Sequence, residues 1–165
     1  MDREAAKGRQ SGRTQEIQRL IGRSLRCAVN LDILGEKTIK IDCDVISADG
    51  GTRTASIIGG YVSLVRAVNY YKSNFNITKH IITNQIAAIS VGVVKGIPCI
   101  DLDYIEDSNA EVDCNVVMAN DGQFIEFQST GEEAKFSKKT ILDFIELVEG
   151  SMPDIFAIQN QAIGK

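Results

Sequence analysis

The sequence predicts an α+β fold: a mixed sheet with helices packed against it, formed by residues 1–165 as a single domain. The first half of the chain holds two stretches with the three-and-four spacing of apolar residues that is typical of amphipathic helices. The second half holds two hairpin-like pairs of apolar runs, followed by another stretch of helical spacing. Hydrophobic residues make up 44% of the chain, which is enough for one buried core.

The first half is expected to form a helix, a strand and a second helix. Helical spacing over residues 14–29 predicts the first helix. Residues 38–46 ("TIKIDCDVI") alternate apolar and charged side chains, which predicts a half-buried strand. Residues 52–72 return to helical spacing. Gly59 and Gly60 within them each cost roughly 1 kcal/mol against alanine, so we expect close packing against a neighbour there.

The second half is expected to form two hairpins and then helices. Residues 86–105 read as two strands joined at Lys95 and Gly96, with Pro98 on an edge strand. Residues 112–128 form a second hairpin around the turn "NDG". Ser137 is expected to cap a helix. Gly150 and Pro153 are expected to end that helix, and residues 154–163 then form a short last one.

The net charge of −4 conceals an uneven distribution. Residues 1–26 carry seven basic and three acidic side chains, a local charge of +4. A polyanion such as RNA would therefore meet the N-terminal part of the surface. A solvated helix face explains the same charges without a ligand.

Metal-binding cysteine or histidine clusters and membrane spans are not expected. The cysteines are scattered, without a C-x-x-C pair, and His80 is far from them in sequence, so a zinc site is improbable and His80 is taken as an ordinary surface residue. Buried free thiols in a reducing cytoplasm are the simple interpretation of Cys27, Cys43, Cys99 and Cys114. No apolar run reaches membrane-spanning length, and the charged opening lacks the apolar stretch of a secretion signal.

The stretch "SADGGTRTASIIGG" (residues 47–60) is a candidate anion site. A glycine turn that leads into a helix presents unpaired N–H groups at the positive end of the helix dipole, and Thr52 and Arg53 add a hydroxyl and a forked cation. The spacing and lysine of a Walker A loop are absent. A plain tight turn, with Arg53 paired to Asp49, is the alternative. "QSGRT" repeats the pattern by placing Arg13 at the start of the first long helix.

The stretch "DLDYIEDSNAEVD" (residues 101–113) is a candidate acidic site with six carboxylates in thirteen residues. Asp101 and Asp103 are expected on one face at the end of a strand. Asp107 and Asp113 flank a short loop that can bring them together. Oxygen-only ligands suit Mg²⁺ or Mn²⁺, which also bind substrate phosphates. An acidic surface loop is the alternative.

Four stretches carry a resemblance to the ribonuclease PH family of phosphorolytic 3′-exoribonucleases. They are "SGRTQEIQRLIGRSLR", "DCDVISADGGTRTASIIG", "VGVVKGIPCIDLDYIEDSNAEVDCNVVM" and "FIEFQSTGEEAKFS". The resemblance runs from about Asp2 to the C-terminus. It implies the fold of that family. It also implies the family's reaction, in which phosphate attacks the last phosphodiester bond of RNA. By this reaction the enzyme trims the 3′ end of tRNA precursors and releases nucleoside diphosphates.

The resemblance also implies roles for single residues and an assembly. Inorganic phosphate would be held by a set of four residues: Arg13, Gly51, Thr52 and Arg53. Asp107 and Asp113 would be the catalytic pair, as ligands of Mg²⁺ or Mn²⁺ or as the acid, and the two roles stay open. Arg3 and Arg9 would contact RNA. Members of the family form homo-oligomers, typically a hexamer of dimers, so tRNA precursors and further copies of the chain are the expected partners.

The chain departs from the family pattern at its N-terminal side. The family carries a further segment before the motif "DREAAKG", so the resemblance implies that this chain corresponds to the C-terminal two thirds of the family's domain. An alternative function is therefore a non-catalytic fragment or assembly subunit that keeps the motifs. A subunit closer to the exosome or to polynucleotide phosphorylase is a further alternative, and a hydrolase that uses water is disfavoured because two arginines are assigned to an anion.

Overall fold

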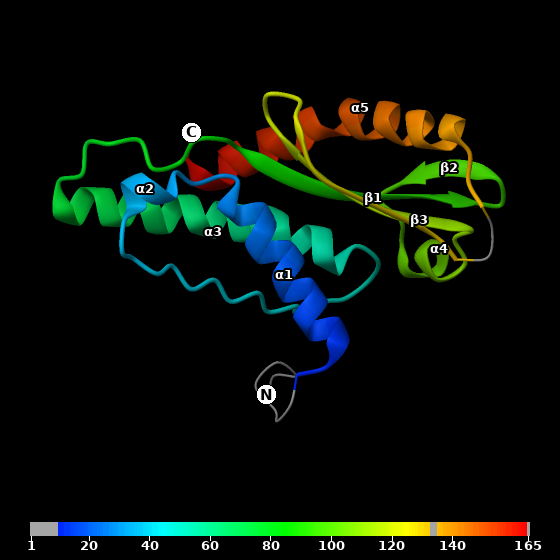
Figure 1. The fold of residues 1–165 in the computed structure, drawn as a ribbon, viewed down its shortest axis with the longest axis horizontal. Coiled ribbons are helices and arrows are strands. Elements are labelled where there is room, and N and C mark those ends of the chain that lie inside the picture. Colours follow the sequence, from blue (N-terminus) through cyan, green and yellow to red (C-terminus); the bar gives the residue numbers. More distant parts are fainter. Residues whose placement is uncertain (1–9, 133–134, 165) are drawn as a thin grey trace.

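The computed structural model describes residues 10–132 and 135–164, and it confirms the α+β class as three layers. Helix α5 covers one face of a sheet, and helices α1 and α3 cover the other (Figure 1). The strand order is β2-β1-β3-β4, and every described pair is antiparallel, where a mixed sheet was expected. The bounds are α1 Gly12–Arg26, α2 Leu31–Leu34, α3 Thr52–Phe75, β1 Ile86–Val94, β2 Ile97–Ile100, α4 Tyr104–Ser108, β3 Val112–Ala119, β4 Phe124–Gly131 and α5 Lys138–Ile163.

The two central strands are buried on both faces because helices cover the sheet from both sides. Toward α5, alternate residues of β1 and β3 pack against Phe144, Val148 and Met152. Toward α1 and α3, the other set packs against Ile57 and Tyr61 among others. This double coverage explains why both strands read as nearly continuous apolar runs. Both predicted hairpins are confirmed, and β2, which contains Pro98, is an edge strand as expected.

Helices α1 and α3 form the layer that leads to the candidate anion site. Ser11 caps α1, since its hydroxyl accepts a hydrogen bond from the Thr14 N–H at 3.1 Å. The close packing expected at the two glycines of α3 is found at one of them. A side-chain carbon at Gly60 would lie 3.2 Å from Leu25 of α1, whereas one at Gly59 would meet nothing within 4 Å.

The strand predicted over residues 38–46 is wrong. Ile39 and Ile41 pack against the core below α1 and α3, so the apolar side of the alternation is used. The segment nevertheless has no strand pairing with any described residue, and Val45 and Ile46 are 51% and 98% exposed. A strand needs a neighbour to complete its hydrogen-bond ladder, and alternation alone does not supply one.

The helix end predicted at Gly150 and Pro153 is also wrong, because α5 continues to Ile163. Proline leaves the carbonyl of Glu149 without its usual donor, but this residue is exposed, so water can take that place. Beyond Pro153 the helix is held by Gln159, which is 1% exposed. Its amide donates to the carbonyls of Ile58 in α3 and Ile86 in β1, at 3.2 and 3.0 Å. These tertiary contacts outweigh the local preference to stop.

Two short helices escaped the sequence reasoning. Asn30 caps α2, and Asp103 caps α4 in a reciprocal capping box with Glu106. The D-x-x-E spacing of that box is a signal that the sequence displayed. The Ser137 cap of α5 is confirmed. Within the described part of the chain, the structure has no helix that is long and apolar enough to cross a membrane.

Candidate active site

One face of the sheet changes from apolar to polar along its length, and this change places the site. On the side of α1 and α3, the β1 residues change from Ile86 and Ala88 to Ser90. In the neighbouring β3, Val117 lies opposite Ala88, and Asp113 lies toward the polar end of the pair. The apolar ends lie under the middle of α3. The polar ends lie toward the start of α3 and toward α4 (Figure 1). Because the side chains of the two neighbouring strands change from apolar to polar, a polar site lies at one end of the core.

The glycine turn begins α3 with free backbone donors. Gly51 is the N-cap residue and has φ of +69°, a left-handed conformation that favours glycine. No side chain caps this helix, and in the described residues the N–H groups of Thr52 and Arg53 have no acceptor. Thr54 instead donates its hydroxyl proton to the Gly51 carbonyl at 2.8 Å. The helix start therefore keeps the donors and the positive dipole end that an anion needs.

Arg53 lies between the glycine turn and α1. Its guanidinium is 3.5 Å from the Glu16 carboxylate, so its described partner is Glu16 and not Asp49. The Arg53 side chain is 24% exposed and that of Glu16 is 46% exposed. Arg13 is exposed in the first turn of α1, one turn before Glu16. The ion pair thus ties the starts of α1 and α3 together, which places both predicted phosphate-binding arginines at neighbouring helix starts.

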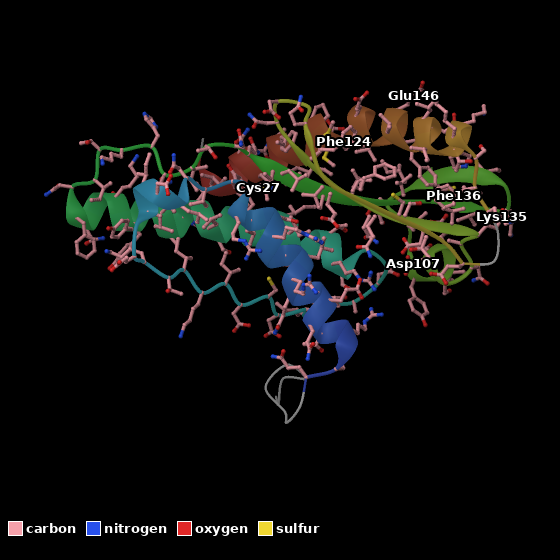
Figure 2. All side chains as sticks on the ribbon, in the orientation of Figure 1. Cys27, Asp107, Phe124, Lys135, Phe136 and Glu146 are labelled. Atoms are coloured by element: carbon pink, nitrogen blue, oxygen red, sulfur yellow. The ribbon has the colours of Figure 1, made fainter. Side chains whose placement is uncertain are left out.

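Asp107 lies close enough to Asp113 to affect the protonation of Asp113. Asp113 lies on β3 between Gly92 of β1 and Thr130 of β4. Burial raises the pKa of Asp113, the Asp107 carboxylate raises this pKa further, and the Arg53 guanidinium lowers it. Asp107 itself is exposed in α4, which Figure 2 shows next to the start of α3. The structure therefore brings together Asp107, Asp113 and Arg53, which the sequence separates by up to sixty residues.

The donor set around Asp113 fits a small divalent cation held by few protein ligands. The Oδ1 atom of Asp113 is buried and has no hydrogen-bond partner in the described chain. In that same part of the chain, no group of three or more His, Cys, Asp or Glu side chains is arranged to hold a metal. Mg²⁺ typically uses one or two carboxylates and keeps several waters. A pair of carboxylates such as Asp107 and Asp113 agrees with that number of ligands, whereas no site made wholly of protein ligands forms among residues 10–132 and 135–164.

The other acidic residues of the loop have different places than expected. Asp101 and Asp103 do not share a strand face, because β2 ends at Ile100. Asp101 has φ of +54°, and Asp103 is the α4 cap. The intervening Leu102 is 2% exposed. Its Cδ1 atom would lie only 2.7 Å from a side-chain carbon at Gly92, so Leu102 packs directly against this glycine. Gly92, directly across from Asp113, is thus a site residue that the sequence reasoning missed.

Several predictions lie outside this site. Arg3 and Arg9, assigned to RNA, are outside the described residues. His80 is exposed, as expected for an ordinary surface residue. The four thiols are free as predicted, but only Cys114 is buried, with a pKa raised to about 12 by that burial. Cys27 and Cys43 are exposed, which corrects the expectation of buried thiols.

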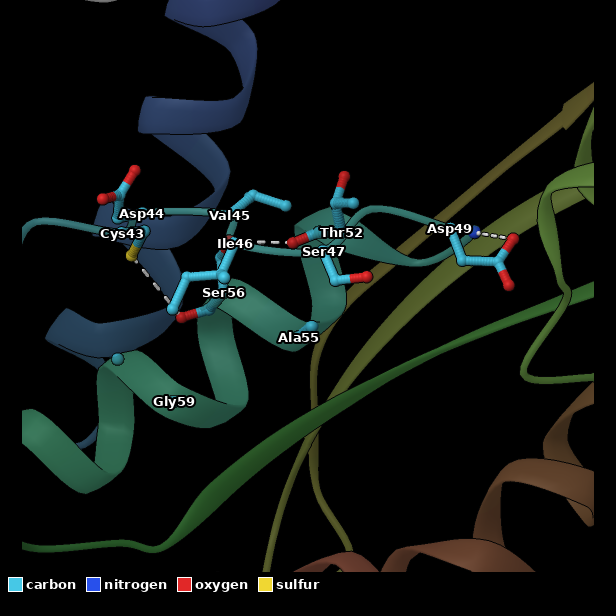
Figure 3. Close-up of a pocket in the computed structure, with 12 residues that line it drawn as sticks. Cys43, Asp44, Val45, Ile46, Ser47, Asp49, Thr52, Ala55, Ser56 and Gly59 are labelled. Carbon is cyan, nitrogen blue, oxygen red and sulfur yellow. Dashed lines mark hydrogen bonds between the residues drawn. The ribbon is translucent and has the colours of Figure 1, made fainter. Parts of the chain in front are cut away.

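A groove adjoins the glycine turn. Its volume is about 510 Å³, and it is lined by residues of the segment 43–50 and by residues within 52–60 of α3 (Figure 3). Cys43 and the exposed Val45 and Ile46 stand over α3 there. Thr52 of the predicted phosphate-binding set lines this groove, whereas Asp107 and Asp113 do not, so the candidate active site extends beyond the groove to the polar end of the sheet.

Comparison with known proteins gives a family in agreement with these motifs. Residues 2–68 match the model of the 3′ exoribonuclease family, domain 1, and residues 84–148 match the model of domain 2 of the same family. The chain is 47% identical over all 165 residues to ribonuclease PH of Corynebacterium kroppenstedtii. It spans 65% of the length of that relative. The expectation of one domain over residues 1–165 stays a prediction.

Solved structures share the fold at low sequence identity. A crystal structure of Rrp46 from rice (Oryza sativa) matches with a TM-score of 0.75 at 16% identity, over 96% of this chain and 70% of that one. A chain of the Archaeoglobus fulgidus exosome, solved with RNA bound to the active site, matches with a TM-score of 0.62 at 16% identity, over 85% and 59% of the two chains. These two likenesses show the fold, whereas the two family models, which between them match most of the sequence, and the 47% identical relative show that the chain belongs to the 3′ exoribonuclease family of ribonuclease PH.

Proposed function

We propose that this chain is a phosphate-dependent 3′ to 5′ exoribonuclease that trims the 3′ end of tRNA precursors and releases nucleoside diphosphates. The observation that carries the proposal is the meeting of Arg53 with Asp107 and Asp113 at the polar end of the sheet. A cationic, donor-rich helix start beside a carboxylate pair can hold an anionic nucleophile next to an acid or a cation. The family membership supports the same reaction class.

The phosphate half of the site would position the nucleophile. The N–H groups at the start of α3, the Thr52 hydroxyl and the Arg53 guanidinium would bind phosphate oxygens, and Gly51 lets the backbone take the required turn. Arg13, at the start of α1, would complete the clamp. An oxygen of the bound phosphate then forms a bond to the terminal phosphorus as the bond to the preceding 3′-oxygen breaks. Holding the two reactants in line supplies much of the rate.

The acidic half would act on the leaving group and on the reacting phosphoryl oxygens. Asp113, whose pKa is raised by burial and by Asp107, is suited to hold a proton for the leaving 3′-oxygen. The same two carboxylates would hold Mg²⁺ or Mn²⁺, which when bound neutralises charge on the phosphoryl oxygens. The role of acid and the role of ligand remain alternatives for this pair.

Substrate, assembly and location belong to the same proposal. The RNA 3′ end would approach across the basic N-terminal region, where Arg3 and Arg9 lie in the sequence. Further copies of the chain would form the homo-oligomer, a hexamer of dimers. A cytoplasmic location is supported by the thiols, because all four cysteines are described and none forms a disulfide.

The test is an incubation of the purified chain with a 3′-extended tRNA, Mg²⁺ and inorganic phosphate. Nucleoside diphosphate that appears only when phosphate is present would establish phosphorolysis. Nucleoside monophosphate in both reactions would instead indicate hydrolysis. An Asp113→Asn variant is the matched control, since a contaminating nuclease would be unaffected by it.

The alternative is a non-catalytic fragment or assembly subunit. Two observations favour it: residues 38–46 have the alternation of a strand but pair with no described strand, and the chain spans 65% of its relative. A folded chain that releases no product from tRNA in the same assay would support this alternative. Circular dichroism and a cooperative thermal transition would establish the folded state.

A further inference from the structure

Two halves of the site come from distant parts of the sequence, and one carboxylate joins them. Asp49 lies in the turn that leads to α3. Its Oδ1 atom accepts a hydrogen bond from the Gly50 N–H at 2.9 Å and another from the Tyr104 N–H at 2.7 Å. The first bond stays within the glycine turn (Figure 3). The second reaches the first residue of α4, the helix that carries Asp107.

Packing around this bond leaves little freedom between the two segments. A side-chain carbon at Gly50 would collide with the Leu102 carbonyl oxygen and lie 2.9 Å from the Asp103 carbonyl oxygen, so the glycine turn rests directly on the acidic loop. Ser90, which is 1% exposed in β1, supports that loop from below. Its hydroxyl accepts from the Leu102 N–H at 3.2 Å, and its carbonyl accepts from the Asp101 N–H at 2.8 Å.

The charge of Asp49 suits this place. The Tyr104 N–H is one of the donors at the start of α4 that have no acceptor within the helix, and a carboxylate is favoured at such a position. Asp103 already caps α4 through the Glu106 N–H at 2.8 Å. The helix start therefore already has a cap without Asp49, which lies 55 residues before Tyr104 in the sequence. The bond from Tyr104 to Asp49 instead links α4 to the glycine turn.

We infer that Asp49 is a positioning residue that sets the distance between the phosphate-binding turn and Asp107 of α4. The inference rests on the proposed function, because it assigns the two segments to the two halves of one reaction. Among the described residues, the hydrogen bonds of Asp49 go only to backbone N–H groups, so we assign its effect to the position of α4 and not to the reacting atoms.

The test compares Asp49→Ala with two matched changes. Asp121→Ala is the control, because Asp121 makes the same kind of bond, to the Gln123 N–H at 3.0 Å, in the turn between β3 and β4 away from the site. Tyr104→Pro removes the donor and leaves Asp49 intact. Proline is favoured at a first helical position, and the preceding Asp103 already has the extended backbone that proline requires.

We expect kcat for phosphorolysis to fall roughly 10- to 100-fold in Asp49→Ala and in Tyr104→Pro, because small displacements of a catalytic group are costly. KM for phosphate should change less than about twofold, since the turn itself keeps its donors. Asp49→Asn keeps an acceptor oxygen and should recover most of the loss. The double variant should be no worse than either single one, because both remove the same bond.

Amide hydrogen exchange at Tyr104, measured by NMR, gives a readout that does not need activity. Exchange should become at least about fivefold faster in Asp49→Ala and stay unchanged in Asp121→Ala. Unchanged exchange, or a kcat equal to that of the control, overturns the inference while the wild type remains an active phosphorylase. An inactive wild type overturns the proposed function first, and the positioning role with it. If Asp49→Ala does not fold, Tyr104→Pro and Asp49→Asn decide the result.

Discussion

The acidic half of the candidate site and its phosphate half are supported in different ways. Asp113 lies on a strand with hydrogen-bonded neighbours on both sides and helices above and below. The glycine turn follows a segment that has the alternation of a strand but no described pairing, and Val45 and Ile46 within it are largely exposed. A strand-like sequence therefore forms a strand only where neighbouring strands complete its hydrogen bonds.

This difference indicates what holds the functional groups in place in each half of the site. A strand that is buried on both faces can hold one carboxylate in a fixed environment, which agrees with the raised pKa of Asp113. The glycine turn is held in place by the start of α3 and by its contact with the acidic loop. Substitutions in the acidic half, in the packing of the sheet and in the phosphate half should therefore have effects of different size.

The largest effect is expected at the proposed acid. Asp113→Asn should lower turnover by roughly 10²- to 10⁴-fold, the usual contribution of a general acid. The chain should stay folded, because the amide replaces a carboxylate that burial disfavours. Phosphorolysis rates and a thermal melt of the same sample check this. Retained turnover would remove Asp113 from the catalytic pair.

The next effect contrasts the packing of the two regions. Phe144→Ala should lower the free energy of unfolding by about 3–5 kcal/mol, because Phe144 is fully buried between α5 and the sheet. Ile46→Ala, at a side chain that is 98% exposed, should change it by less than about 0.5 kcal/mol. Urea unfolding measures both. A cost at Ile46 similar to that at Phe144 would show that the segment is covered in solution.

A smaller effect is expected for the phosphate arginine. Arg53→Ala should raise KM for phosphate by roughly 10- to 100-fold, the loss of a charge-assisted hydrogen bond. RNA affinity should fall much less, because the remaining basic residues of the N-terminal region persist. Steady-state kinetics at varied phosphate and a filter-binding assay with RNA separate the two. Equal losses would contradict the role assigned to Arg53.

Replacing Glu16, the partner of Arg53, should change KM for phosphate by a smaller factor and in the opposite direction. Glu16 is 3.5 Å from the Arg53 guanidinium, so its carboxylate competes with an incoming phosphate. Glu16→Gln should lower KM for phosphate by at most about fivefold, since a partly exposed ion pair is weak. Asp143→Asn is a matched control, because it removes an ion pair with Lys139 in α5. A raised KM would show that Glu16 orients Arg53 productively.

The smallest effect concerns stability against pH. Because the folded-state pKa of Asp113 is raised, its ionised form disfavours folding at pH above that pKa. This unfavourable contribution should vanish as the pH falls through the folded pKa toward the ordinary value of 3.8. The stability advantage of Asp113→Asn over the wild type should therefore be greatest near pH 7 and shrink toward pH 4. Urea midpoints of the two proteins at several pH values test the sign.

Local sequence was enough for the elements whose signals agree with their surroundings. Apolar spacing located α1 and α3, turn residues located both hairpins, and Ser137 marked the start of α5. The glycine turn and the acidic loop were recognised as candidate sites from residue type alone. The short loop between Asp107 and Asp113 predicted that these two carboxylates can come together, and the structure places Asp107 and Arg53 close enough to Asp113 to shift its pKa. Their roles remain predictions.

Tertiary structure decided what depends on partners distant in sequence. Residues 38–46 lack a strand partner, so their alternation does not make a strand. Gln159 bonds to α3 and β1, so α5 continues past a proline that local rules treat as an end. Glu16, and not Asp49, faces Arg53, and Asp49 instead bonds to the start of α4. Propensity and periodicity describe a segment with its nearest neighbours, whereas these outcomes depend on hydrogen bonds and burial between segments that only the fold brings together.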